Sequence, residues 1–220
     1  MPQPIVPFLR RAGLAALIAG FTLSAASLPG PTVDESRSDK KSETVVLAGG
    51  CFWGVQAVFD ALKGVSSAIS GYAGGAKSTA HYEIVSTGTT GHAESVQVTF
   101  DPSQVSFGQL LKIYFSVAHD PTELNRQGPD EGTQYRSEIY YTTEEQKHIA
   151  EAYIQQLTAA KAFRRPIVTK VAQLPAFYAA EDYHQNYVAK NPHQPYVAYN
   201  DLPKLTNLRA EFPEMLKGKQ

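Results

Sequence analysis

Apolar runs typical of strands alternate along the chain with apolar residues at helical spacing, and together they predict strands interleaved with helices. The run Thr44–Ala48 is continuously apolar and ends at Gly49 and Gly50, which is typical of a buried strand. Directly after it, apolar residues recur at helical spacing. The same patterns predict strands at 44–48, 65–72, 93–100, 135–141 and 167–172, and helices at 52–63, 106–118, 143–160, 179–190 and 202–216. We therefore expect one α+β domain, an open sheet with helices packed on it.

The N-terminal region has a different pattern from the rest of the chain. Two arginines, Arg10 and Arg11, precede the apolar run Ala12–Leu23, and small residues follow at Ser24–Ser27. A basic start, a short apolar run and small residues predict a secretory signal peptide within 1–30. The alternative is an uncleaved membrane anchor, although the run is shorter than the roughly 20 residues of a comfortable bilayer span.

Two further boundaries follow from the leader. A polar segment, 31–42, is predicted to be a linker, and 43–220 to be the working domain. The leader also predicts where the protein works. We expect it to be exported to the periplasm or secreted, or else anchored to a membrane through the uncleaved segment.

Charge and cysteine content exclude several classes of function. The chain has 20 Lys and Arg against 21 Asp and Glu, a formal net charge of −1, so we expect no nucleic-acid partner. It has one cysteine, Cys51. A single thiol cannot form an internal disulfide, a CxxC redox pair, or a multi-cysteine zinc or iron–sulfur site.

Cys51 lies at the junction between the first predicted strand and the first predicted helix. A helix N-terminus offers unpaired N–H groups and a positive dipole end, which favour a reactive thiolate. The aromatic residues Phe52 and Trp53 follow it and can wall a small apolar pocket beside the sulfur. The alternative is a buried structural cysteine with ordinary core aromatics around it.

Glu94 begins a strand whose alternation places its side chain on the core face. It shares parity with Val96, Val98 and Phe100, whereas the intervening residues are polar. A desolvated carboxyl has a raised pKa and can hold a proton near neutral pH, as a general acid must. The alternative is a glutamate at a strand end that has already emerged into solvent.

The polar, glycine-rich loop 125–137 is a candidate site element, because loops carry functional groups more often than cores do. Tyr135, at its end, and Tyr82 offer phenolic donors that could polarise an oxygen. With 12 tyrosines in the chain, packing is the commoner role for any one of them.

Several motifs occur in order along the chain. They are Gly50–Gly54 (GCFWG), Thr90–Glu94 (TGHAE), His119–Thr122 (HDPT), Gln127 and Gly128 with Asp130, Gln134–Ser137 (QYRS) and Glu181–Gln185 (EDYHQ). Together they closely resemble the peptide methionine sulfoxide reductase A family, from about Thr44 to the C-terminal helix. The resemblance implies a ferredoxin-like two-layer α+β sandwich. It also implies reduction of the S-epimer of methionine sulfoxide, in proteins and as the free amino acid.

The resemblance further implies a role for each candidate residue. Cys51 would attack the sulfoxide sulfur and become a sulfenic acid, and Glu94 would protonate the sulfoxide oxygen. The substrate-binding residues would be Tyr82 and Tyr135 for that oxygen, Phe52 and Trp53 for the S-methyl group, and Asp130 for orientation. No metal or bound prosthetic group is implied.

The chain departs from many members of this family because it has no resolving cysteine near its C-terminus. It is therefore expected to be of a single-cysteine type. An external thiol must then reduce the sulfenic acid: thioredoxin, a glutaredoxin-like protein or a small thiol. The expected partners are oxidised proteins, free methionine sulfoxide and this reductant, and the protein is expected to be a monomer.

Two other classes of function stay open from the residues alone. A cysteine hydrolase or acyltransferase would pair Cys51 with His184 or His92 as a base and would need an oxyanion hole. A non-catalytic secreted binding protein would bury Cys51 as a structural residue.

Overall fold

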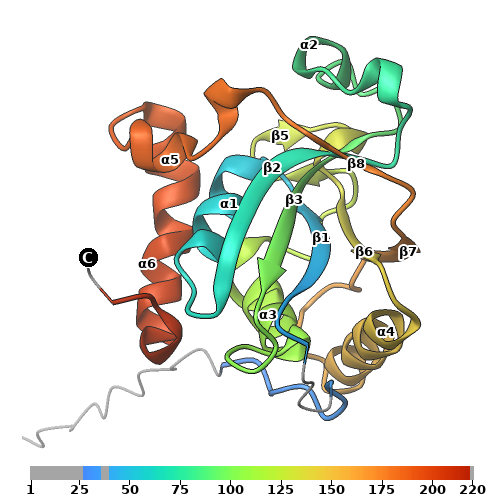
Figure 1. Cartoon of the computed structure of the whole chain (residues 1–220), viewed down its shortest axis with the longest axis vertical. Coiled ribbons are helices and arrows are strands. Elements are labelled where there is room, and N and C mark those ends of the chain that lie inside the picture. Colours follow the sequence, from blue (N-terminus) through green and yellow to red (C-terminus); the bar gives the residue numbers. More distant parts are fainter. Residues whose placement is uncertain (1–26, 36–39, 219–220) are drawn as a thin grey trace, which may run out of the picture.

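The computed structural model describes residues 27–35 and 40–218, and most of the predicted signal peptide or anchor lies outside these residues. A six-stranded mixed sheet forms the centre, in the order β7-β6-β1-β3-β2-β8 (Figure 1). Its strands are β1 (Glu43–Gly49), β2 (Val65–Ala73), β3 (Ala93–Phe100), β6 (Ser137–Tyr141), β7 (Lys170–Gln173) and β8 (Phe177–Ala179). All neighbouring strands are antiparallel except β6 and β7.

The helices pack mainly on one face of the sheet. They are α1 (Phe52–Asp60), α2 (Tyr82–Val85), α3 (Phe107–Ile113), α4 (Glu144–Ala159), α5 (Tyr187–Lys190) and α6 (Leu202–Glu211). Core-facing strand residues such as Leu47, Val96 and Ile139 share one large cluster with apolar residues of α1, α3, α4 and α6. A smaller cluster around Val46 and Tyr140 covers the other face. This arrangement confirms the expected α+β class.

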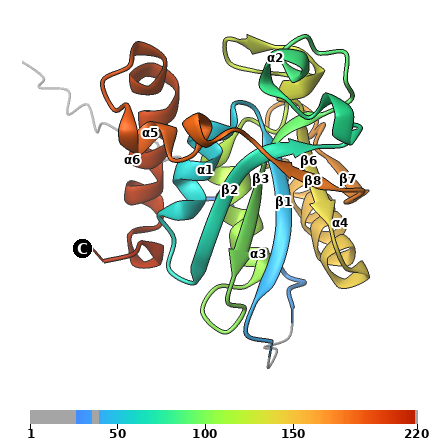
Figure 2. The same ribbon diagram turned by 45° about the horizontal axis from the view of Figure 1, so that its top comes forward.

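One end of the sheet carries the loops that surround the candidate site. Figure 2 shows α2 beside the short hairpin of β4 (Arg126–Gln127) and β5 (Asp130–Glu131) at this end. The two segments are joined where the Thr133 hydroxyl donates to the carbonyl of Gly88 at 2.8 Å. The predicted loop 125–137 thus lies close to the residues that follow α2.

Most predicted elements are present, with ends moved by a few residues, but the predicted helix at 179–190 is wrong. Residues 177–179 form β8 on the edge of β2, and only 187–190 are α-helical. Gln185 explains the extended path, because its side chain accepts from the Ser70 N–H at 3.0 Å and donates to the Ser70 carbonyl at 2.9 Å. A helix through this segment would lose that pairing with β2.

Residues 27–35, which include the start of the predicted linker, lie against the domain. Asp34 accepts a hydrogen bond from the Gly108 N–H at 2.8 Å, and Glu35 accepts one from the Phe107 N–H at 2.6 Å. These two carboxyl groups therefore satisfy N–H groups at the start of α3 that no helical carbonyl can reach. Further bonds join Pro29, Gly30 and Thr32 to Tyr153 and Gln156 of α4. Within 27–35 and 40–218, no helix is both long and apolar enough to span a membrane.

Candidate active site

The β1–α1 junction places Cys51 immediately before the first turn of α1. Gly50 adopts a φ of +86°, in the region that favours glycine. A Cβ atom on Gly50 would lie 2.5 Å from Cβ of Gln127, so the absence of a side chain also allows close approach. Gln127 in turn holds its loop to Asp120, accepting from the backbone N–H and donating to the carbonyl. The β1–α1 junction and the loop that contains Gln127 thus pack against each other next to Cys51.

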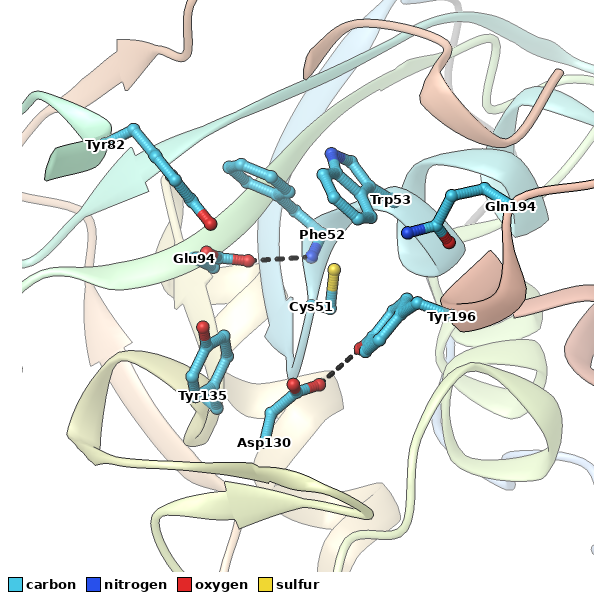
Figure 3. Close-up of a pocket in the computed structure, with 9 residues that line it drawn as sticks. All are labelled: Cys51, Phe52, Trp53, Tyr82, Glu94, Asp130, Tyr135, Gln194 and Tyr196. Atoms are coloured by element: carbon cyan, nitrogen blue, oxygen red, sulfur yellow. Dashed lines mark hydrogen bonds between the residues drawn. The ribbon is translucent and has the colours of Figure 1, made fainter. Parts of the chain in front are cut away.

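A cavity of about 230 Å³ opens at this junction. Its lining residues, drawn in Figure 3, are Cys51, Phe52, Trp53, Tyr82, Glu94, Asp130, Tyr135, Gln194 and Tyr196. All seven candidate residues from the sequence therefore line one pocket, although they come from five separate parts of the chain. Gln194 and Tyr196 are additions that the sequence analysis did not single out.

Glu94 is buried, with 2% of its surface exposed, on the same strand face as Val96 and Val98. The predicted parity is correct, and the alternative of a solvated strand end is wrong. The Phe52 N–H donates to Glu94 Oε2 at 3.1 Å. Burial nevertheless dominates and raises the pKa of Glu94 to about 8, with Asp130 and Asp201 adding to the rise. Glu94 is therefore mainly protonated at neutral pH.

The charge state of Cys51 differs from the expectation based on its place at a helix N-terminus. Burial raises the pKa of its thiol well above the ordinary value, and the carboxyl groups of Glu94 and Asp201 raise it further. The Trp53 N–H and the charge of Lys204 act in the opposite direction but are smaller effects. In the substrate-free site the cysteine is thus a thiol rather than a thiolate, because desolvation outweighs the helix dipole.

Trp53 forms a rigid wall of the pocket. Its indole stacks on Tyr187 with ring centroids 3.8 Å apart, and Tyr196 meets it edge-on at 5.8 Å. The indole N–H donates to Nδ1 of His184 at 3.1 Å. Phe52 lies next to the same imidazole, with ring centroids 5.0 Å apart. Two aromatic side chains from the first turn of α1 therefore line the pocket together, as the sequence predicted.

The two candidate phenols approach Glu94 from different elements. Figure 3 shows the hydroxyl groups of Tyr82 and Tyr135 both directed toward the Glu94 carboxyl. Glu181 holds the start of α2, because it accepts from the Tyr82 N–H at 2.9 Å and from the Tyr72 hydroxyl at 2.8 Å. Burial raises the pKa of both pocket phenols, so each is a neutral hydrogen-bond donor.

Asp130 closes the lower side of the pocket in Figure 3 and accepts a hydrogen bond from the Tyr196 hydroxyl. Sequence reasoning missed Tyr196 because the segment around it carried no periodic pattern. The available signal was an aromatic residue directly after the proline-containing stretch Asn191–Pro195, which is typical of a loop. That signal is too weak to select one tyrosine among 12.

The hydrolase alternative is not supported by the positions of its two candidate bases, His92 and His184. The ring nitrogens of His92 lie at 3.2 Å from the Gly75 N–H nitrogen and 3.0 Å from the Ala76 carbonyl oxygen, and Nδ1 of His184 accepts from Trp53. Neither histidine lines the cavity. In the described part of the chain, no group of three or more His, Cys, Asp or Glu side chains could hold a metal ion.

The chain is similar to known methionine sulfoxide reductases. A family model described as peptide methionine sulfoxide reductase matches residues 43–216. The peptide methionine sulfoxide reductase MsrA 2 of Mesorhizobium japonicum is 59% identical over 178 residues, covering 81% of this chain and 91% of that protein. The chain belongs to the peptide methionine sulfoxide reductase A family. It is an oxidoreductase that reduces methionine sulfoxide to methionine.

Other reductases of this family show the same likeness in sequence and in structure. The MsrA 2 protein of Synechocystis is 50% identical over 211 residues, covering 94% of this chain and 99% of that protein. Reduced Mxr1 of Saccharomyces cerevisiae superimposes with a TM-score of 0.63 at 32% identity, covering 72% of this chain and 91% of its own. Methionine sulfoxide reductase A of Corynebacterium diphtheriae gives a TM-score of 0.61 at 36% identity, covering 77% and 85% of the two chains.

The bond between Trp53 and His184 generates a prediction about this reductase. His184→Phe keeps an aromatic ring in place but removes the acceptor of the indole N–H. Loss of this partly buried hydrogen bond, about 1 kcal/mol, should raise KM for a methyl sulfoxide roughly fivefold. Trp53 is the only tryptophan, so its fluorescence emission should shift in the same variant.

Tyr199→Phe is the matched control, because Tyr199 is 82% exposed and belongs to the same C-terminal region. It should change neither the emission nor KM. An unchanged spectrum and an unchanged KM in His184→Phe would show that the bond does not hold the indole.

Proposed function

We propose that this reductase acts on the S-epimer of methionine sulfoxide, in oxidised proteins and as the free amino acid, through a sulfenic acid on Cys51. The observation that carries the proposal is a buried carboxyl, Glu94, that lines the same pocket as the only thiol of the chain and whose pKa burial raises to about 8. Reduction of a sulfoxide needs a nucleophile for sulfur and an acid for oxygen, and this pocket offers one of each.

The first half of the reaction transfers the oxygen atom. Cys51 Sγ bonds to the substrate sulfur while Glu94 gives its proton to the sulfoxide oxygen. The oxygen then passes from the substrate sulfur to Sγ as the bond between Sγ and the substrate sulfur breaks, and the thiol proton restores Glu94. The products are a thioether and Cys51 sulfenic acid, so the cysteine sulfur is oxidised by two electrons and the substrate sulfur is reduced by two.

The remaining lining residues bind the substrate in this proposal. Tyr82 and Tyr135 donate to the sulfoxide oxygen, which their shared orientation toward Glu94 supports. Phe52 and Trp53 enclose the S-methyl group in an apolar wall. Asp130, together with Tyr196, orients the substrate beside that wall.

The second half of the reaction needs an external thiol. That thiol attacks the sulfenic sulfur, releases water and forms a mixed disulfide, and a second thiol then frees Cys51. We propose thioredoxin, a glutaredoxin-like protein or a small thiol as the reductant, since the chain has no second cysteine. We further propose that the enzyme is a monomer and that its β1-α1-β2-β3-α3-β6 unit is ferredoxin-like, which the strand order β6-β1-β3-β2 supports.

We propose that residues 1–30 export the protein to the periplasm or outside the cell, on the basis of their basic, apolar and small-residue pattern. The processed protein should be recovered outside the cytoplasm, with an N-terminus near Ser24–Ser27 by N-terminal sequencing. An intact leader in a membrane fraction would instead favour the anchored form.

Removing the Glu94 acid tests its role directly. Glu94 loses its proton as the pH rises through about 8. The single-turnover rate of methionine formation should therefore fall above that pH, because the acid is lost. Glu94→Gln should slow the step by roughly 10²- to 10⁴-fold and should lack this fall. Glu83→Gln, an exposed glutamate on α2, is the control and should keep the native profile. An unchanged rate in Glu94→Gln would overturn the general-acid role.

The stoichiometry without reductant tests the single-thiol cycle. One cysteine can accept one oxygen atom, so excess S-sulfoxide should yield about one methionine per chain. The R-epimer should yield none, and neither should Cys51→Ser. A yield near two would show that a second group recycles Cys51, and turnover by Cys51→Ser would exclude it as the nucleophile.

A further inference from the structure

Asp201 is a buried carboxyl that the reaction above does not use. It is 0% exposed, and neither of its oxygens has a hydrogen-bond partner. Among the described residues its one ion-pair partner is Lys204, whose Nζ lies 3.6 Å from Oδ1 and whose side chain is 20% exposed. Burying a carboxylate with so few partners costs free energy, so its position calls for a physical role.

This carboxyl lies against the first turn of α1, next to the thiol. A Cβ atom on Gly54 would come within 2.2 Å of Asp201 Oδ1 and 2.8 Å of Lys204 Nζ. The space that any larger residue would fill at Gly54 is thus occupied by the ion pair. Gly54 is three residues after Cys51, so Asp201 brings a negative charge to the N-terminal end of the nine-residue helix α1.

A carboxylate at that place acts against the effect that a helix N-terminus usually has on cysteine. The positive end of α1 would stabilise a Cys51 thiolate, whereas Asp201 is attracted to the same end and repels the thiolate. Glu94 uses the same turn, because it accepts from the Phe52 N–H. Asp201 therefore competes with the sulfur for the positive field of the helix, and Glu94 takes one of the N–H donors of the same turn.

We propose that Asp201, held by Lys204, is a positioning residue of the reductase that keeps Cys51 in its thiol form while the pocket is empty. The proposal rests on the proposed function in one respect, namely that Cys51 is the nucleophile. Its consequence follows from the lone cysteine. A thiol reacts with oxidants and electrophiles far more slowly than a thiolate, so the only reactive sulfur is protected until a substrate binds.

Other titratable groups also face the thiol, and a test of Asp201 must leave them in place. They are Glu94 from β3, Asp130 from β5, Tyr82 from α2, Tyr135, Tyr196 and the Asp201–Lys204 pair. All of these except the pair line the substrate cavity. Asp201 can therefore be altered without removing a group that lines the pocket.

The test is the rate at which iodoacetamide alkylates Cys51, measured against pH. Asp201→Asn keeps the shape of the side chain and removes its charge. The midpoint of the profile should move down by about one pH unit, which makes alkylation at neutral pH roughly tenfold faster. Asp60→Asn is the matched control. Asp60 is the last residue of α1, about 12 Å from Phe52 along the helix axis. It should leave the midpoint unchanged.

A second variant keeps the proposal testable if Asp201→Asn does not fold. Asp201→Asn with Lys204→Gln removes both charges and should move the midpoint in the same direction by a smaller amount. A midpoint equal to the wild type in the folded variants would overturn the proposal. Alkylation does not depend on turnover, so this failure is distinguishable from failure of the proposed function, which would appear as sulfoxide reduction by Cys51→Ser.

Discussion

The exclusion of water from the Cys51 thiol and the Glu94 carboxyl is the constraint on which the rest of the site depends. Desolvation keeps Glu94 protonated to about pH 8 and keeps the thiol uncharged, against the pull of the α1 dipole. The thiol and the Glu94 carboxyl are therefore both uncharged near neutral pH in the empty pocket. A polar but uncharged sulfoxide fits such a site, because it can accept hydrogen bonds without bringing a charge that must be buried.

The C-terminal part of the chain supports the walls of the pocket. His184 and Tyr187 fix the indole of Trp53, Tyr196 reaches across to Asp130, and Asp201 fills the space beside the first turn of α1. This region holds no cysteine. In this protein it shapes the pocket and its electrostatics.

Periodicity predicted the core of the fold well, because strand alternation and helical spacing reflect burial directly. The parity of β3 placed Glu94 on the core face from the sequence alone, and burial of Val96 and Val98 on that face agrees. The predicted helix at 179–190 was wrong because this segment is held by a side-chain contact with a distant strand. Gln185 binds the backbone of Ser70, and no local pattern encodes a partner so far away in sequence. The docking of residues 27–35 on α3 and α4 was missed for the same reason.

The sequence by itself selected Cys51 and Glu94 as the candidate reacting groups, because a lone cysteine at a glycine-bounded junction and a core-facing glutamate are local features. It also identified seven residues that line one pocket. Only the tertiary structure decided their charge states. A pKa depends on which groups and how much water surround a side chain, and those surroundings come from segments far apart in the chain. A helix N-terminus predicted a thiolate at Cys51, whereas burial beside Glu94 and Asp201 makes it a thiol.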